Sequence, residues 1–251
     1  MNPWNRQTAE VQTQSSARAI DQGLRGYMLK IYNYMTSALI LTGLVAYFAS
    51  QAAVTGGADG QLALTPFGEA IFVSPLKYVV MLSPLAFILA ISFGLNRMQT
   101  STLQACFWAF SAVMGLSISS IALVYTGESI ARVFFITAAT FGGMSIFGYT
   151  TKRDLTGIGH FLIMGVWGLV IASLVNLFMQ SSGLSLVISY ISVFVFTGLI
   201  AYDTQKLKEI YYQVAGHGEG MARATIMGAL NLYLDFINLF LSLLRIMGDR
   251  R

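Results

Sequence analysis

The chain has 251 residues, of which 55% are hydrophobic and only 10% are charged, and its formal net charge is +4. A soluble domain carries about 25% charged residues, so this composition excludes an ordinary soluble protein and indicates an integral membrane protein. The small positive balance is typical of orientation signals at the ends of membrane helices, and nucleic acid is not an expected partner. One cysteine and two histidines exclude an intramolecular disulfide and a histidine-rich metal site.

Seven apolar runs follow one another along the chain, and each could cross a hydrocarbon core of about 30 Å as a helix. We predict a polar cytosolic tail at 1–30, a seven-helix transmembrane domain at 31–248 and a short C-terminal tail at 249–251. The runs lack the period-two alternation of barrel strands, so the predicted fold class is an all-α membrane protein and strands are not expected. The predicted spans are 31–52, 76–96, 102–124, 130–151, 159–179, 184–205 and 224–248, with a turn at 180–183.

Small residues recur every fourth position in the third run, at Ser111, Gly115 and Ser119. This spacing predicts a helix face on which a neighbouring helix packs closely. Ala139 and Gly143 stand in the same relation in the fourth run.

The distribution of lysine and arginine predicts the orientation, because these residues concentrate on the cytosolic side. With seven spans, the side of the N-terminal tail holds 10 of them and the other side holds 5, which places the N-terminus in the cytosol. A re-entrant last run would give 13 against 2. Seven spans are nevertheless the better prediction, because the 25 residues of 224–248 suit a span better than a hairpin.

Two aspartates lie within the predicted spans. Asp235 is near the middle of the last run, where an ionisable group is costly and therefore marks a functional hypothesis. It shares one helix face with Asn231, Asn238 and Ser242, and Asp203 continues a partly polar face of the preceding run. Such faces should turn inward, toward other helices or a water-filled cavity.

Two carboxylates in close quarters cannot both ionise cheaply, so they would share one proton. A pair of this kind can sense pH or bind calcium transiently through its oxygens. Arg97, which ends the second span on the side of Asp203, could lock the helices until protonation or a cation competes. The alternatives are structural: Asp203 as a helix-end residue paired with Lys206 or water, Asp235 as a polar packing contact, and Arg97 as a topology anchor.

The segments AYDTQ at 201–205 and NLYLDFINLFLSLLRIMG at 231–248 resemble the Bax inhibitor family. The resemblance implies a bundle with the last helix at its centre and a pH-sensitive calcium leak; eukaryotic members suppress cell death at the endoplasmic reticulum. It also implies that Asp203 and Asp235 are the paired aspartates and Arg97 the latch. The pairing requires adjacent carboxyl groups, whereas the predicted bounds offset them by more than about 10 Å. Either the last helix starts deeper and later, or the sixth helix projects beyond 205.

The resulting hypothesis is a passive leak for calcium or another cation, with the bilayer and the cation as partners. Asp203 and Asp235 are the gate and pH sensor, Arg97 is the latch, and Asn231 and Asn238 line a cavity. No cofactor and no enzymatic activity are expected, and short loops favour a bacterial inner membrane. The alternative is a non-conducting scaffold or regulator of other membrane proteins. An intramembrane aspartyl protease is disfavoured, because only its Tyr-Asp motif is matched and Gly-x-Gly-Asp is absent.

Overall fold

The computed structural model describes residues 3–56, 62–94 and 97–251, with side chains at 21–55, 63–94 and 97–251. Its elements are α1 (Pro3–Ala53), β1 (Val54–Gly56), β2 (Leu62–Leu64), α2 (Pro66–Phe72), α3 (Leu76–Gly94), α4 (Thr100–Ile118), α5 (Ile121–Val124), α6 (Gly127–Thr150), α7 (Thr156–Met179), α8 (Ser182–Val214) and α9 (Gly218–Met247). The described chain is almost entirely helical, which confirms the all-α fold class.

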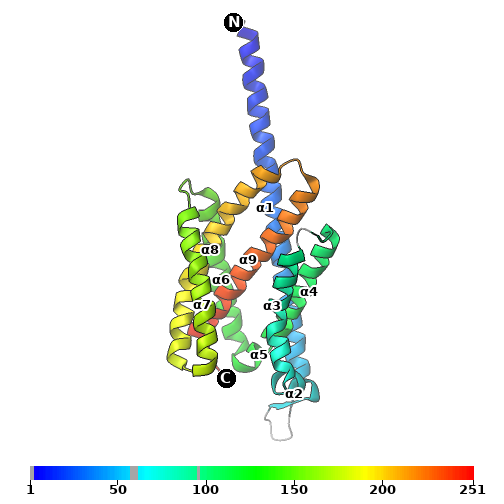
Figure 1. The fold of residues 1–251 in the computed structure, drawn as a ribbon, viewed down its shortest axis with the longest axis vertical. Coiled ribbons are helices and arrows are strands. Elements are labelled where there is room, and N and C mark those ends of the chain that lie inside the picture. Colours follow the sequence, from blue (N-terminus) through cyan, green and yellow to red (C-terminus); the bar gives the residue numbers. More distant parts are fainter. Residues whose placement is uncertain (1–2, 57–61, 95–96) are drawn as a thin grey trace.

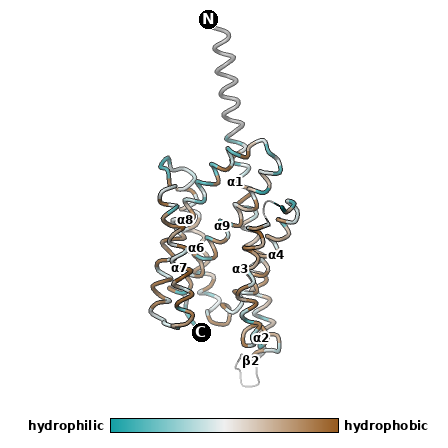
Figure 2. The backbone as a smooth tube through the Cα atoms, in the orientation of Figure 1, coloured by the Kyte–Doolittle hydropathy of each residue, from teal (hydrophilic) through white to brown (hydrophobic). Residues whose placement is uncertain are grey.

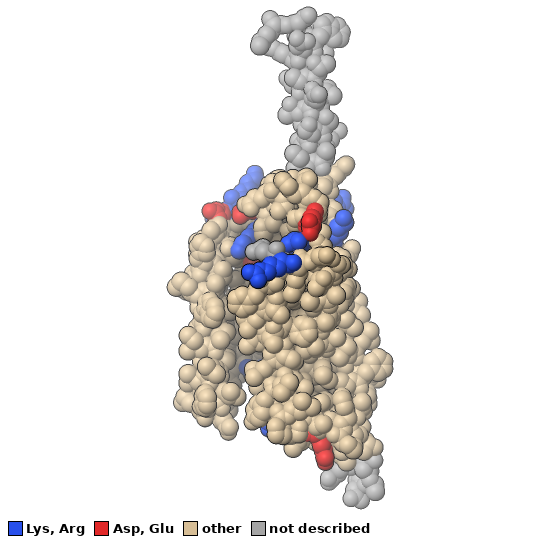
Figure 3. Space-filling model, turned by 45° about the vertical axis from the view of Figure 1, so that its right-hand side comes forward, with Lys and Arg blue, Asp and Glu red and all other residues tan. Residues whose placement is uncertain are grey.

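Within the described residues, seven helical segments are long and apolar enough to cross a membrane, as the sequence predicts. They are Asp21–Ala53 of α1, α3, Thr100–Val124 from α4 and α5 together, α6, α7, α8 and α9. In Figure 1 the spans lie side by side, and α1 projects from one end of the bundle, here called the tail end. The strands and the C-terminus lie toward the other end, here called the hairpin end. Hydrophobic residues follow the spans (Figure 2), and on the face in Figure 3 the charges gather at the two ends.

The hairpin between the last two spans is longer than predicted. Helix α8 continues to Val214 instead of ending near 205, and α9 begins at Gly218 instead of 224, so only a three-residue turn separates them. Leu207 and Tyr211, four residues apart, are buried, which shows that α8 continues as an amphipathic helix past its most apolar part. The second explanation of the aspartate offset is therefore correct: the sixth span projects beyond its predicted end.

Two further local predictions need correction. The third span is interrupted between α4 and α5, where the Ser119 hydroxyl donates to the Leu116 carbonyl; such bonds compete with the helical ladder. Two short strands, which were not expected, pair in the glycine-rich connection after α1. The turn at 180–183 is confirmed: Gln180 adopts a left-handed conformation with φ of 50° and Ser181 caps α8.

Close helix packing occurs at one of the two predicted small-residue faces. On α4, a Cβ added at Gly115 would lie 2.5 Å from the Thr42 carbonyl oxygen, so α1 and α4 meet there at backbone distance. On α6, Gly143 faces open space. The close approach on that helix is at Gly148, where an added Cβ would lie 2.2 Å from the Ala201 carbonyl oxygen of α8.

Helix α9 is the most buried of the spans. In its most apolar stretch 67% of the residues are buried inside the protein, against at most 39% in any other span. It packs against α1, α4, α6 and α8, and Figure 1 shows it crossing the bundle obliquely. These contacts explain how a helix with several polar residues is kept within the membrane-spanning part of the protein.

Candidate functional site

Asp203 is held in place by the residues that flank it on α8. An added Cβ at Gly159 of α7 would lie 2.3 Å from the ring of Tyr202, so this ring packs directly on the α7 backbone. The Thr204 hydroxyl is 3.2 Å from that of Ser145 on α6. These contacts press one face of α8 against α6 and α7.

Gln205 fixes α8 to the turn between α6 and α7. Its amide nitrogen donates to the Arg153 carbonyl and its amide oxygen accepts from the Leu155 N–H, both at 2.8 Å. One turn further along α8, Lys208 donates to the Tyr149 carbonyl at the end of α6. The rotation of α8 about its axis is therefore set by polar contacts immediately after Asp203.

The structure brings Asp203 and Asp235 together at the interface of α8 and α9. Their carboxyl groups form a hydrogen bond with each other. Asp235 is 5% exposed and Asp203 is half-buried. Because a carboxylate can only accept, one of the two groups must carry a proton to make this bond. The two aspartates predicted to form a pair are thus in contact, and the extension of α8 beyond 205 removes the basis of the expected offset.

The polar surroundings of the pair are sparse. The Asp235 Oδ2 atom is buried, and within the described part of the chain no N–H group and no hydroxyl group donates a hydrogen bond to it. Lys206, one turn along α8, acts electrostatically on Asp203, and its ammonium nitrogen lies 5.5 Å from the centre of the Tyr202 ring. A buried carboxyl group without donors is costly in its charged form, so a proton between the two groups lowers the cost of burying them.

The other predicted site residues do not join this pair. Arg97 follows α3 at the tail end; its side chain is exposed, and neither of the ion pairs among the described residues includes it. Asn231 is exposed, whereas Asn238 is half-buried and donates to the Leu234 carbonyl of its own helix. The latch role of Arg97 and the cavity-lining role of the two asparagines stay predictions.

A metal ion would find few ligands at this site. Calcium takes 6–8 oxygen ligands, and the described residues contain no group of three or more His, Cys, Asp or Glu side chains that could hold a metal. Two carboxyl groups alone do not make up such a ligand set. They do not form a resident binding site.

A second buried polar contact, which the sequence did not predict, involves Tyr233 of α9. The Tyr233 and Thr42 hydroxyl oxygens are 2.7 Å apart, and Thr42 donates to the Ser111 carbonyl at 2.8 Å. Since Thr42 has one proton to give, Tyr233 is the donor to Thr42. This chain of bonds joins α9, α1 and α4. The regular spacing of small residues that includes Ser111 predicted close packing of α4. The sequence of α1 contains no pattern that distinguishes Thr42 from its neighbours.

Comparisons with known proteins identify relatives along almost the whole chain. The family described as inhibitor of apoptosis-promoting Bax1 matches residues 24–251. Protein RP147 of Rickettsia prowazekii is 48% identical over 97% of this chain and 98% of its own length. A Caulobacter vibrioides protein is 43% identical over the full length of both chains. The inner membrane protein YbhL of Escherichia coli is 42% identical over 91% of this chain and 94% of its own length.

Proposed function

The chain belongs to the Bax inhibitor family, and from this premise we propose that it is a pH-sensitive passive leak for calcium or a similar cation. The observation that carries the proposal is the contact between Asp203 and Asp235 inside two adjacent spans. Intramembrane carboxyl groups are expensive and mark ion or proton pathways. No covalent chemistry is part of this function.

The pair acts as a gate through its shared proton. With one proton present, the carboxyl–carboxyl hydrogen bond ties α8 to α9. Without it, two negative charges lie in contact and repel each other. The same negative charge attracts a cation, which can take the place of the proton between the oxygens. Gating and pH sensing are therefore two consequences of one titratable pair.

Arg97 has a separate role in the proposal as a latch at the tail end. An arginine can pair with a carboxylate through two parallel hydrogen bonds, but the exposed Arg97 side chain makes no ion pair with Asp203. The latch therefore requires a movement that brings the end of α3 toward α8. We assign it to a second conformation of the protein.

The proposed location is a bacterial inner membrane, with the tail end in the cytosol. The excess of lysine and arginine on that side, 10 against 5, supports the orientation. The relative YbhL, named as an inner membrane protein, supports the membrane.

The test is calcium flux through liposomes that contain the purified protein, measured between pH 6 and pH 8. We expect a leak whose rate changes with pH, and we expect Asp203→Asn and Asp235→Asn to abolish that change. Asp154→Asn is the matched control, because Asp154 is exposed in the turn between α6 and α7. Absence of any leak at every pH would favour the alternative function, a scaffold for other membrane proteins.

A further inference from the structure

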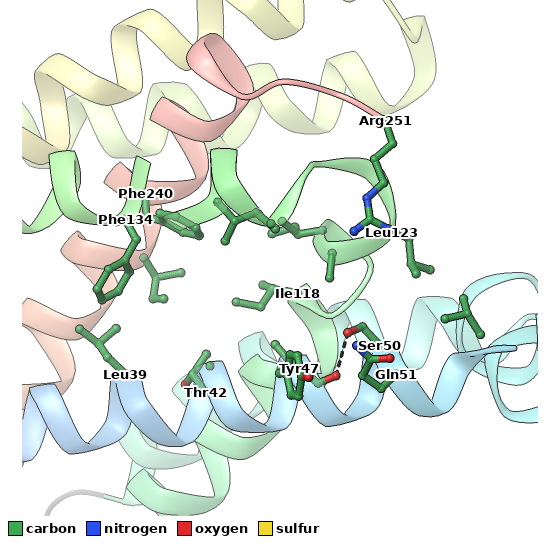
Figure 4. Close-up of a pocket in the computed structure, with 18 of the residues that line it drawn as sticks. Leu39, Thr42, Tyr47, Ser50, Gln51, Ile118, Leu123, Phe134, Phe240 and Arg251 are labelled. Carbon is green, nitrogen blue, oxygen red and sulfur yellow. Dashed lines mark hydrogen bonds between the residues drawn. The ribbon is translucent and has the colours of Figure 1, made fainter. Parts of the chain in front are cut away.

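A second feature borders a different face of α9 from the aspartate pair. It is a cavity of about 590 Å³ between α1, the α4–α5 segment, α6 and α9. Figure 4 shows its apolar walls, and Leu39, Ile118, Phe134 and Phe240 are among the side chains that form them. Its volume is within the 300–1,000 Å³ of small-molecule sites.

The cavity opens sideways, between α1 and α6. Helix α6 packs against α8 and α9 and is not among the helices that pack closely on α1. Gly43 and Tyr47 of α1 and Phe134 of α6 line the cavity and are exposed, the two aromatic side chains to 57% and 39%. Because these residues belong to membrane spans, the opening faces the acyl chains of the bilayer.

The mouth of the cavity at the hairpin end is polar and holds a guanidinium group. Arg251 lies there with Ser50 and Gln51 (Figure 4). The backbone of Arg251 is fixed, because its N–H donates to the Val124 carbonyl at 2.9 Å. The Asp249 N–H also donates to the Ser129 hydroxyl at 2.8 Å, so two bonds tie the last residues to the segment that leads into α6.

This arrangement is unsuited to a calcium vestibule. A guanidinium group at the mouth repels a cation, and apolar walls offer none of the oxygen ligands that calcium needs. The same features suit an amphiphile: the long axis of the cavity runs along α1 from Gln51 at the mouth to Leu39 deep in the span. An apolar chain would fill the interior, and an anionic group would meet Arg251.

We propose that this cavity binds one acyl chain of an anionic phospholipid, whose phosphate pairs with Arg251. Basic sites between membrane helices are typical binding places for anionic headgroups. A lipid tail that enters the cavity only exchanges one apolar environment for another. The preference for an anionic lipid therefore comes from Arg251, and the requirement for a chain comes from the void that it fills.

The experiment is native mass spectrometry of the delipidated full-length protein in detergent. The probes are phosphatidylglycerol and phosphatidylcholine with identical acyl chains, and glycerol phosphate as a headgroup without a chain. We expect one tightly bound phosphatidylglycerol, an affinity about fivefold weaker for phosphatidylcholine, and no binding of glycerol phosphate. Arg251→Gln should remove the preference between the two lipids and leave chain binding intact.

Variants that fill the cavity with a side chain provide a second test of the proposal. A Cβ added at Gly43 meets no atom within 4 Å, so Gly43→Phe places a ring in the cavity and should abolish binding of both lipids. Gly168→Phe on α7 is the matched control: its position is equally open and lies outside the cavity. Ala46→Phe repeats the test if Gly43→Phe misfolds.

Unchanged lipid binding in a folded cavity-filled variant would overturn the proposal, as would equal affinity for the two lipids in the wild-type protein. The lipid site and the proposed leak are independent of each other. Native mass spectrometry measures lipid binding, and calcium flux measures the leak. The two experiments are separate, so one proposal can fail while the other holds.

Discussion

The α8–α9 interface at the aspartate pair and the cavity beside α1 are built on opposite principles. Around Asp203 and Asp235 the helices are in close contact, and Gln205 and Lys208 hold α8 by hydrogen bonds to neighbouring backbone carbonyls. Beside the cavity α1 and α6 are not in close contact, and the walls between them are apolar. One region confines titratable groups, whereas the other leaves space beside the guanidinium group of Arg251.

The difference shows how one helix supports two environments. Asp235 and Phe236 are neighbours on α9, yet the carboxyl group meets α8 and the ring lines the cavity. Successive side chains on a helix point in directions about 100° apart, so α9 presents its polar and apolar residues to different partners. The same substitution should therefore lower the melting temperature more in the tightly packed region than in the open one.

The largest expected effect comes from adding the same side chain in each region. Gly148→Leu forces a Cβ to within 2.2 Å of the Ala201 carbonyl oxygen, whereas the Cβ of Gly43→Leu meets no atom within 4 Å. Overpacking costs about 1–3 kcal/mol or more. Both variants gain the same helix propensity, so the difference between their melting temperatures isolates packing. We expect Gly148→Leu to melt well below Gly43→Leu.

Equal melting temperatures for the two leucine variants would contradict the contrast between a tightly packed and an open region. Gly143→Leu provides a control within α6 itself, since Gly143 also faces open space. Its melting temperature should match that of Gly43→Leu.

A smaller effect is expected from the polar contact between the two regions. Tyr233→Phe removes the hydroxyl that donates to Thr42, while Thr42 keeps its bond to the Ser111 carbonyl. A buried hydrogen bond contributes about 1 kcal/mol, and thermal unfolding in detergent should show a loss of that order. Tyr47→Phe, at an exposed position of α1, should leave the unfolding free energy unchanged. A comparable loss in both variants would show that the buried bond carries no special weight.

The smallest effect concerns Asp154, in the turn that Gln205 holds. Hydrogen bonds from the Thr156 side chain and backbone lower the pKa of Asp154 below its ordinary value. A lowered pKa in the folded state favours folding above the unfolded pKa, and the contribution is lost as the pH falls through the folded pKa. Thr156→Ala should raise the pKa of Asp154 toward its ordinary value, as followed by carbon NMR of the carboxyl group. A titration identical to wild type would exclude the side-chain bond.

The sequence predicted the number of spans because apolar runs of about 20 residues permit little else in a membrane. It also pointed to Asp203 and Asp235, since a carboxyl group inside an apolar run is conspicuous. It failed where helices continue beyond the apolar part: the buried positions Leu207 and Tyr211 extend α8 among charged residues, and hydropathy alone ended the span too early.

Other features depend on contacts that no local pattern encodes. The close approach on α6 is at Gly148 because Ala201 of α8 lies opposite it. The cavity lies between α1 and α6, which do not pack closely on each other, and its residues come from segments far apart in the sequence. In each case the relevant partner lies on another helix, whose position follows from the packing of the whole bundle.

The central claim is that Asp203 and Asp235 act as one unit, and a double-mutant cycle of calcium flux tests it most directly. Initial leak rates of wild type, Asp203→Asn, Asp235→Asn and the double variant are compared at pH 6 and pH 8 in liposomes. Groups that act together are strongly non-additive, so either single variant should lose the pH response as completely as the double variant. Independent, additive effects of the two substitutions, or an unchanged pH response in all variants, would contradict the account.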